Sequence, residues 1–273
     1  MMGRFRLTTI ILYGAVSLWS VFVLLPLLWM VFAAFKTRRE IFTDPMGLPD
    51  SLSFASFERA WGVGIGQFML NSAFVTLISV SIIITVAGMA AYVLARSTNK
   101  WLQIIYLLIV AGFAVPVTAV LVPLYQMVSA AGFLNNHLAI ALPYAAYGIP
   151  FTTILFYAFF LDFPRELEEA ARLDGCSHVQ IFFMIIVPLS GPAVASAAIF
   201  QAVFIWNEFL LAMLMLTRPA LKTLPVGILQ LQGEFTSDWP AVMAGLAVAT
   251  LPILAIFIFA QKYFVRSLAG LGK

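Results

Sequence analysis

Long apolar blocks alternate with short polar segments along the whole chain. A helix needs about 20 mostly apolar residues to cross a bilayer, and this pattern leaves room for six such helices. The first block, Leu7–Phe35, holds no formal charge and is longer than the apolar region of a signal peptide, so we interpret it as a retained span. The expected spans are residues 8–35, 68–95, 102–128, 138–161, 189–216 and 240–262.

One block, Trp101–Leu161, runs for 61 residues without a formal charge, which is enough for two crossings and a turn. The turn is expected within Ala130–His137, where glycine and two asparagines favour a chain reversal. Pro116 and Pro123 both fall in the third expected span. Two interpretations stay open for this pair: neighbouring helices satisfy the freed carbonyls, or the prolines kink the span and shape a pathway.

Composition agrees with a membrane protein, since 63% of the residues are hydrophobic and only 10% are charged. A soluble domain is typically about 25% charged. The net charge of +3 comes from basic residues at the ends of apolar blocks rather than from a stripe, which argues against nucleic-acid binding. With a single Cys176 and two distant histidines, His137 and His178, the chain offers neither an internal disulfide nor a metal site.

The expected fold class is therefore all-α: a polytopic protein whose residues 1–273 form a single transmembrane domain. Lysine and arginine are enriched on the cytoplasmic side of membrane proteins. Cytoplasmic N- and C-termini place nine basic residues inside and six outside, and the inner segments other than the charged 162–188 segment are short. The inner residues are Arg4, Arg6, Arg96, Lys100, Arg165, Arg172, Lys262, Arg266 and Lys273. We therefore expect a multi-pass protein of the cell (inner or plasma) membrane with both termini cytoplasmic.

A charged island interrupts the apolar pattern between the fourth and fifth spans. Five of the twelve acidic residues lie within thirteen positions, and each would cost several kcal/mol in hydrocarbon, so residues 162–188 are expected to form an inner aqueous loop. Asp162 is a candidate N-cap, Pro164 suits a first turn and Gly175 suits a C-terminal stop. A second short helix is expected from about Ser177.

The island helix is expected to carry a narrow, mostly apolar face and a charged opposite side. Leu167, Ala170, Ala171 and Asp174 have the spacing of one face, while Glu168 and Arg172 are spaced to pair across one turn. A face of small residues favours docking of a partner. The alternative is a connector that lies on the lipid surface, although such connectors usually carry basic polar faces.

The same stretch carries a longer motif. Glu169-Ala170-Ala171, Gly175, Ile185 and Val187-Pro188 resemble the E-A-A-x3-G-x9-I-x-L-P signature of the permeases of binding-protein-dependent ABC importers, with Val187 in place of leucine. "WNEFLLAMLML" from Trp206, "TLPVGI" from Thr223 and the tail from Ala260 resemble the carbohydrate branch, in particular the MalG-like subunit of maltose-type transporters. The tail departs from that family's usual glycine-rich ending, so the resemblance leaves open whether the tail contacts the ATPases.

The resemblance implies a division of labour among several chains. The island would be a coupling helix seated on a cytoplasmic ATPase, and the residues expected to couple are Glu168, Glu169, Ala170, Ala171, Asp174 and Gly175. Two ABC ATPase subunits would use ATP and Mg, a second and related permease would complete the pathway, and an extracytoplasmic solute-binding protein would deliver a sugar. The chain itself has no G-x-x-x-x-G-K-[ST] phosphate loop, so we expect no cofactor and no enzymatic activity in it.

A candidate sugar contact lies near the end of the fifth expected span. Glu208 is the only formal charge well inside a span, where a central acid costs about 2.5–3.5 kcal/mol on insertion scales. Trp206 and Asn207 beside it have the chemistry to stack on a sugar and to hydrogen-bond it. An equally open alternative is that Asn207 and Glu208 lock helices together near the outer leaflet.

Other classes of membrane protein fit less well. An ion-coupled secondary transporter is the main alternative, but such carriers generally need several intramembrane ionisable residues and a repeat with broken helices. A channel would need charge rings or paired pore motifs, and an intramembrane enzyme would need catalytic residues within its spans. We find none of these patterns in the sequence.

Overall fold

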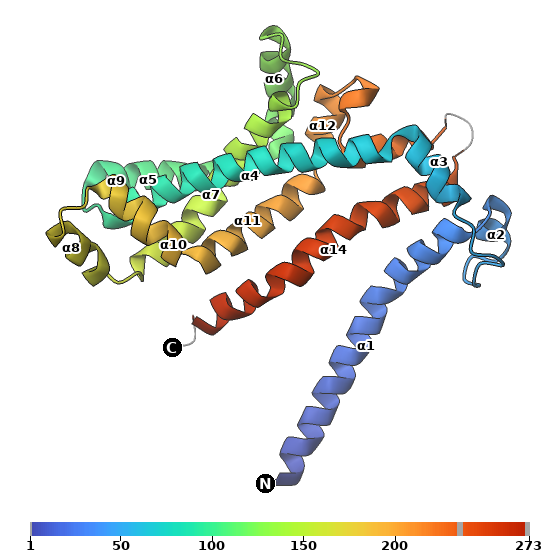
Figure 1. The fold of residues 1–273 in the computed structure, drawn as a ribbon, viewed down its shortest axis with the longest axis horizontal. Helices are drawn as coiled ribbons and strands as arrows, with labels where there is room; N and C mark the ends of the chain where they lie inside the picture. Colours follow the sequence, from blue (N-terminus) through green and yellow to red (C-terminus); the bar gives the residue numbers. More distant parts are fainter. Residues whose placement is uncertain (1, 234–236, 271–273) are drawn as a thin grey trace. The chain divides into compact units, whose positions relative to one another are not determined.

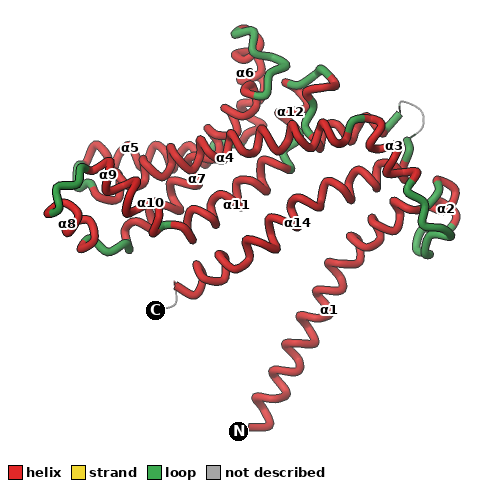
Figure 2. The backbone as a smooth tube through the Cα atoms, in the orientation of Figure 1, coloured by secondary structure: helices red, strands yellow, loops and turns green. Residues whose placement is uncertain are grey.

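The computed structural model describes residues 2–233 and 237–270, and within them the side chains of residues 9–233 and 237–258. All regular secondary structure in this part is helical, as Figures 1 and 2 show. The expected tail segment from Ala260, the basic residues Arg4, Arg6, Lys262 and Arg266, and Lys273 lie outside the described side chains. The chain forms two compact units: one runs to Gly66 and includes Gly227–Leu251, and the other comprises Gln67–Val226 and the chain from Pro252.

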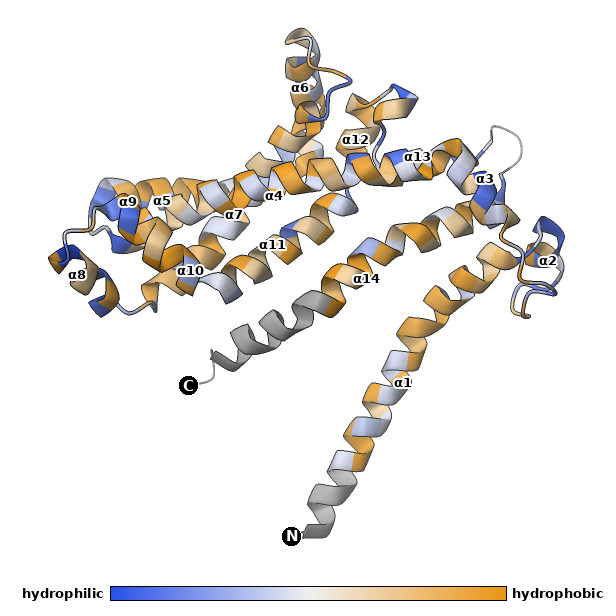
Figure 3. Ribbon diagram, viewed as in Figure 1, coloured by the Kyte–Doolittle hydropathy of each residue, from blue (hydrophilic) through white to orange (hydrophobic). Residues whose placement is uncertain are grey.

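The first unit contains the long helix α1 (Met2–Phe35), two short helices and the start of α14 (Trp239–Gly270). Helix α1 is apolar over most of its described length (Figure 3), as expected for residues 8–35. After it, α2 (Arg38–Thr43) begins with a capping box between Thr37 and Glu40, and α3 (Ala55–Val63) packs against α1. The loop between α2 and α3 is fixed by buried Lys36, whose Nζ donates to the Asp44 carbonyl at 2.7 Å.

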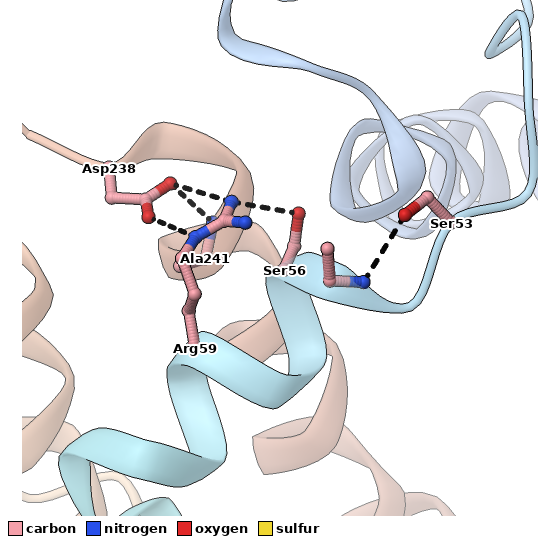
Figure 4. Close-up of polar contacts among 6 residues, drawn as sticks. Ser53, Ser56, Arg59, Asp238 and Ala241 are labelled. Carbon is pink, nitrogen blue, oxygen red and sulfur yellow. Dashed lines mark hydrogen bonds and ion pairs between the residues drawn. The ribbon is translucent and has the colours of Figure 1, made fainter.

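An ion pair joins α3 to the start of α14 (Figure 4). The Arg59 guanidinium lies 2.6 Å from the Asp238 carboxylate, which also accepts the Ala241 N–H at 3.2 Å and so caps α14. Partial burial alone would raise the pKa of Asp238. The hydrogen bonds from Arg59 and Ala241 and the Arg59 charge more than offset this effect and lower the pKa below its usual range. The cap therefore stays charged at neutral pH.

The second unit is built on helices α4 (Ile65–Arg96), α5 (Lys100–Phe113), α7 (Leu138–Leu161) and α11 (Gly191–Trp206). Helix α7 packs against both α5 and α11. Small residues allow these helices to approach closely, and Ser79 on α4 donates a 3.2 Å hydrogen bond to the Ala141 carbonyl on α7. Two apolar clusters lie along the helices, one around Ile140 and Met215 and the other around Phe156 and Phe182.

The third expected span is not one straight helix. Helix α5 and helix α6 (Val117–Ala130) meet at an angle of 97° across Ala114–Pro116. Proline has no N–H to donate and disfavours helical geometry in the residue before it, so Pro116 ends the helix that α5 begins. Pro123 lies inside α6, which continues through it. Of the two interpretations, the kink therefore applies to Pro116 and the tolerated proline to Pro123.

The turn between α6 and α7 lies where the sequence predicts it. Gly132 and Asn135 both have positive φ, at 68° and 57°, which is the left-handed region that glycine and asparagine adopt most readily. The side-chain Oδ1 of Asn135 accepts N–H groups from Thr217 and Arg218, each at 2.8 Å. The turn is thereby tied to the loop that follows α12 (Leu210–Met215).

The fifth span was expected to be one helix over residues 189–216, and the structure differs from this prediction. Helix α11 ends at Trp206, residues 207–209 are not helical, and α12 starts a new short helix at Leu210. The loop after α12 contains the 3₁₀ turn η2 (Pro219–Leu221) and leads into α13 (Leu224–Ile228) and the 3₁₀ turn η3 (Leu229–Leu231). Helix α14 begins at Trp239, close to the expected start at residue 240.

Gly148, in the middle of α7, lies where side chains of α4 and α11 come close to the α7 backbone. A Cβ at this position would lie 2.4 Å from Cδ1 of Ile83 on α4 and 2.9 Å from Oε1 of Gln201 on α11, and both neighbours are buried. We expect Gly148→Ala to destabilise the protein by about 1–3 kcal/mol through overpacking, measured as a lower Tm of the purified complex. Gly88→Ala is the control, because its new methyl group would meet Phe182 at 3.7 Å. Equal Tm values for the two variants would contradict the prediction.

Candidate functional site

The segment between α7 and α11 contains the charged island and protrudes as helix α8 (Glu166–Leu173) at one end of the second unit (Figures 1 and 3). The expected start of this helix was wrong. Asp162 is the C-cap of α7, and α8 begins four residues later after Arg165, without a side-chain cap. Its first turn carries Glu166, Glu168 and Glu169, whose negative charges suit the positive end of the helix dipole.

The expected stop at Gly175 is confirmed. The Gly175 N–H donates to the Arg172 carbonyl and the Cys176 N–H to the Ala171 carbonyl, each at 3.0 Å. These two bonds form a Schellman motif, which needs a left-handed residue at the position that Gly175 occupies with φ of 83°. Because the motif reverses the chain sharply, α8 stands as a separate short element.

The helical spacing predicted a pair between Glu168 and Arg172, but Glu168 pairs with Arg96 instead. Its side chain is only 4% exposed, and its Oε1 lies 2.6 Å from the guanidinium of Arg96 at the end of α4. Its Oε2 accepts a hydrogen bond from the Tyr92 hydroxyl at 2.9 Å. Helical spacing favoured a pair along one helix, but burial of the carboxylate against α4 favours a partner that is buried with it.

Arg96 links three elements. Besides Glu168, its guanidinium donates to the Phe160 carbonyl at the end of α7 and to the Phe163 carbonyl, at 3.2 Å, in the link to α8. A basic side chain in the last turn of α4 also suits the negative end of that helix dipole. We call Arg96, Tyr92 and Glu168 the α4–α8 clamp. The clamp therefore attaches α8 to the ends of α4 and α7.

The clamp divides the expected coupling residues into two groups. Glu168 and Ala171 face the body of the second unit and are buried. Ala171 therefore does not belong to an outward docking face, contrary to expectation. Glu169, Ala170, Asp174 and Gly175 are exposed, together with Leu167. Leu173 is 90% exposed, more than any other large apolar side chain of the described residues, so the outward surface of α8 is partly apolar.

Behind α8 the chain returns to the spans through a bent connection. Helix α9 (His178–Ile181) starts close to the expected position, with Ser177 as its N-cap and a capping box to Gln180. It continues as a π-helical turn (Phe182–Ile186) and α10 (Val187–Leu189), and then meets α11 at 77°. Pro188 cannot donate to the carbonyl four residues earlier, and the preceding Val187 N–H bonds to Phe182 in the wider π pattern. Phe182 and Ile186 anchor this turn in the core.

The candidate sugar contact lies at the opposite end of α11. Glu208 accepts the N–H groups of Leu210 and Leu211 at 2.9 and 3.0 Å and so caps α12, and it also accepts the Tyr144 hydroxyl of α7. This geometry is that of a lock between helices. Asn207 is exposed, and its Nδ2 donates to the Val203 carbonyl of its own helix at 2.7 Å, whereas Trp206 is buried.

Sequence reasoning did not identify the residues that hold α8 in place. Tyr92 and Arg96 are one helical turn apart on the same face of α4, and Arg96 is a single charge at the end of an apolar block. That pattern indicates a polar pair facing the protein, but it does not indicate which acid is the partner. Among the described residues, no group of three or more His, Cys, Asp or Glu side chains is placed to hold a metal ion.

Comparison with known proteins identifies the family. Residues 83–270 match the family of binding-protein-dependent transport system inner membrane components, which is more than half of the chain. The chain belongs to this family. It is a permease subunit of a binding-protein-dependent ABC importer and a multi-pass inner-membrane protein, not the enzyme of the system. Membership excludes the alternative of an ion-coupled secondary transporter.

Relatives of the permease align along nearly its whole length. The probable ABC transporter permease protein YurM of Bacillus subtilis is 39% identical over 94% of this chain and 88% of its own. The sulfoquinovosyl glycerol transport system permease protein SmoH of Agrobacterium fabrum is 36% identical over 94% of this chain and 91% of its own. A bacterial ABC transporter involved in the import of the polysaccharide alginate has the same fold, with a TM-score of 0.83, 21% identity and coverage of 95% and 97% of the two chains.

Proposed function

We propose that this permease forms, with a second and related permease, the pathway for a sugar that an extracytoplasmic binding protein delivers and two ABC ATPases import. The proposed coupling to the ATPases rests on one observation. Helix α8 is a short acidic helix whose outward face is exposed and whose inner face is held to α4 by the α4–α8 clamp. The sugar is supported by relatives such as SmoH and the melibiose/raffinose/stachyose import permease protein MelC of Bacillus subtilis.

We further propose that the chain is one permease domain that crosses the membrane six times. Four helices are long enough to span it alone, and each of the two bent pairs is long and apolar enough when taken together. Arg96 contacts Glu168, so residues 97–167 must cross an even number of times, and α7 accounts for one crossing. The α5–α6 pair therefore supplies the other. Asn135 contacts Thr217, so the same reasoning assigns one crossing to the bent pair that ends with α11.

The proposed orientation places α8, and with it both termini, in the cytoplasm. Arg96, Lys100, Arg165 and Arg172 all lie at the α8 end of the second unit or in its loops, in agreement with the enrichment of basic residues inside. Glu169, Ala170, Asp174 and Gly175 would then meet the ATPase, while Glu168 and Ala171 hold the helix to the spans. ATP and Mg would be bound by the ATPase subunits.

A crosslinking experiment tests this assignment. Leu173→Cys in the assembled complex is expected to form a thiol-reactive crosslink to the ATPase, because Leu173 is the most outward apolar side chain of α8. Leu52→Cys, at an exposed loop position of the first unit, is the control and is expected to give none. The complex in liposomes is expected to import sugar only with ATP and the binding protein. Labelling of the Leu173→Cys thiol only from the external side, or sugar uptake by this chain alone under an ion gradient, would contradict the proposal.

A further inference from the structure

The break between α5 and α6 lies at the level of the middle of a neighbouring span. The closest neighbour of a Cβ on Gly112, at the end of α5, is Pro150, which lies halfway along the 24 residues of α7. The rings of Phe113 and Phe151 are 5.9 Å apart at the same level. The interruption of the helix at Ala114–Pro116 therefore falls inside the membrane and not at its surface.

Backbone that is not helical cannot face lipid tails, because its polar groups would have no partners there. Residues 113–116 are exposed in the described chain, and no side chain caps the first turn of α6 at Pro116. Such breaks occur at membrane depth only where they are buried in protein or line a water-filled cavity. The N–H groups of Ala114 and Val115 donate to the Ala111 and Gly112 carbonyls, but the first turn of α6 has no side-chain cap. On its exposed side the break therefore requires either a partner chain or a water-filled cavity.

A groove of about 330 Å³ begins at this break and continues between α7 and α11. We call it the α5–α7–α11 groove. Phe151 of α7 and Phe200 of α11 stack on each other in its wall, with ring centroids 4.6 Å apart. Half of its lining residues are aromatic and one carries an amide; these are Phe113, Tyr147, Phe151, Phe200, Phe204 and Gln201. The rest of the lining is aliphatic or glycine.

The amide of Gln201 is held rigidly in this aromatic wall. The residue is 3% exposed, and its Nε2 donates to the Thr152 hydroxyl at 2.9 Å and to the Gly148 carbonyl at 3.2 Å. Ligand sites are mostly apolar and aromatic with a few fixed polar groups, and they start at about 300 Å³. Aromatic faces cover the C–H faces of sugar rings, and the two hydrogen bonds of the buried Gln201 amide fix the part of α11 that carries them.

The exposed face of α11 extends the groove toward the candidate sugar contact. Phe200, Phe204 and Asn207 follow i, i+4, i+7 spacing, and all three are exposed. Asn207 therefore continues the stripe of α11 that lines the groove, one turn beyond Phe204. We propose that the α5–α7–α11 groove is a sugar subsite of the translocation pathway, with stacking on Phe151 and Phe200. This inference rests on the proposed sugar transport.

Thiol labelling in the assembled complex tests the groove. Phe113→Cys and Phe200→Cys introduce a thiol at two exposed groove positions, and Phe257→Cys introduces one at an equally exposed position of α14 that does not line it. A charged, membrane-impermeant methanethiosulfonate reacts with thiolate, which forms in water and is disfavoured in apolar surroundings. Each site is read from its own peptide by mass spectrometry, so that Cys176 does not interfere.

We expect both groove cysteines to react at least ~10-fold faster than the Phe257→Cys thiol, because only the groove is wet. The sugar that the wild-type complex takes up is selected first from a panel of melibiose, raffinose and diacetylchitobiose. Addition of that sugar with binding protein and ATP is expected to slow labelling in the groove and to leave the control unchanged.

The outcomes separate the subsite from the proposed function. If wild-type complex imports sugar but both groove cysteines react at the rate of the control, the groove faces lipid or a partner helix and the subsite is wrong. Fast labelling that sugar does not slow shows a water-filled groove without a sugar subsite. If wild-type complex imports none of these sugars, the proposed sugar transport fails first, and the labelling rates still report whether the groove is wet.

Discussion

Arg96→Ala is expected to destabilise the permease by about 3–5 kcal/mol and to abolish ATP-driven uptake, because it leaves the carboxylate of Glu168 buried without its cation. The substitution also removes the donor to the Phe160 and Phe163 carbonyls, so α8 loses its attachment to both α4 and α7. Thermal unfolding of the purified complex measures the first effect. The ratio of sugar imported to ATP hydrolysed measures the second.

The control for Arg96→Ala is Lys100→Ala. Lys100 is an exposed basic residue four positions further on, and its removal is expected to change stability by less than ~0.5 kcal/mol. The double variant Arg96→Met/Glu168→Leu tests the physical cause, since an apolar pair of similar volume often recovers the stability of a buried ion pair. Recovery of stability without recovery of coupling would show that the polar clamp transmits movement. An Arg96→Ala variant as stable and active as Lys100→Ala would refute the role of the clamp.

Glu208→Ala is expected to lower stability by roughly 2–4 kcal/mol, from the lost cap of α12 and from the Tyr144 hydroxyl left without its acceptor. Glu208→Gln keeps an oxygen acceptor in the same place and is expected to be much milder. The Tm of the purified complex distinguishes the two variants. If Glu208→Ala were as stable as the wild type, the Glu208 contacts between α7 and α12 would not contribute to the stability of the protein.

Asn207→Ala separates the lock from the pathway. Among the described residues, the Asn207 side chain bonds only to the Val203 carbonyl of its own helix, so its loss is expected to change the Tm little. As the exposed end of the α11 stripe, it is expected to reduce transport and the stimulation of ATP hydrolysis by substrate. If both activities stayed intact, Asn207 would not belong to the sugar path.

Much of this architecture follows from local sequence. Apolar length alone placed α1, α4, α7 and the start of α14 within a few residues, because a bilayer sets the number of apolar residues that a span needs. Gly132, Asn135 and Gly175 marked chain reversals correctly, because these residues adopt positive φ at low cost. The position of the Glu169-Ala170-Ala171 motif outside the spans follows from the density of acids around it.

Contacts between distant residues could not be predicted in this way. Helical spacing allows Glu168 to pair with Arg172, whereas the folded chain also brings it near Arg96. Only the packing of α8 against α4 decides between these two partners. Pro116 and Pro123 look alike in the sequence, yet the helix breaks at the first and continues through the second. Glu208 was recognised as an unusual acid, but its role as a cap depends on α11 ending two residues before it.

The sequence by itself determined which segments are apolar enough to enter the membrane, where the chain must turn and which helix is too charged for hydrocarbon, because transfer of apolar and charged groups between water and hydrocarbon depends on local composition. The tertiary structure alone decided what α8 is attached to, which face it leaves exposed and where a span opens beside an aromatic groove. These features depend on which side chains are buried together, and such burial joins residues as far apart as Arg96 and Glu168.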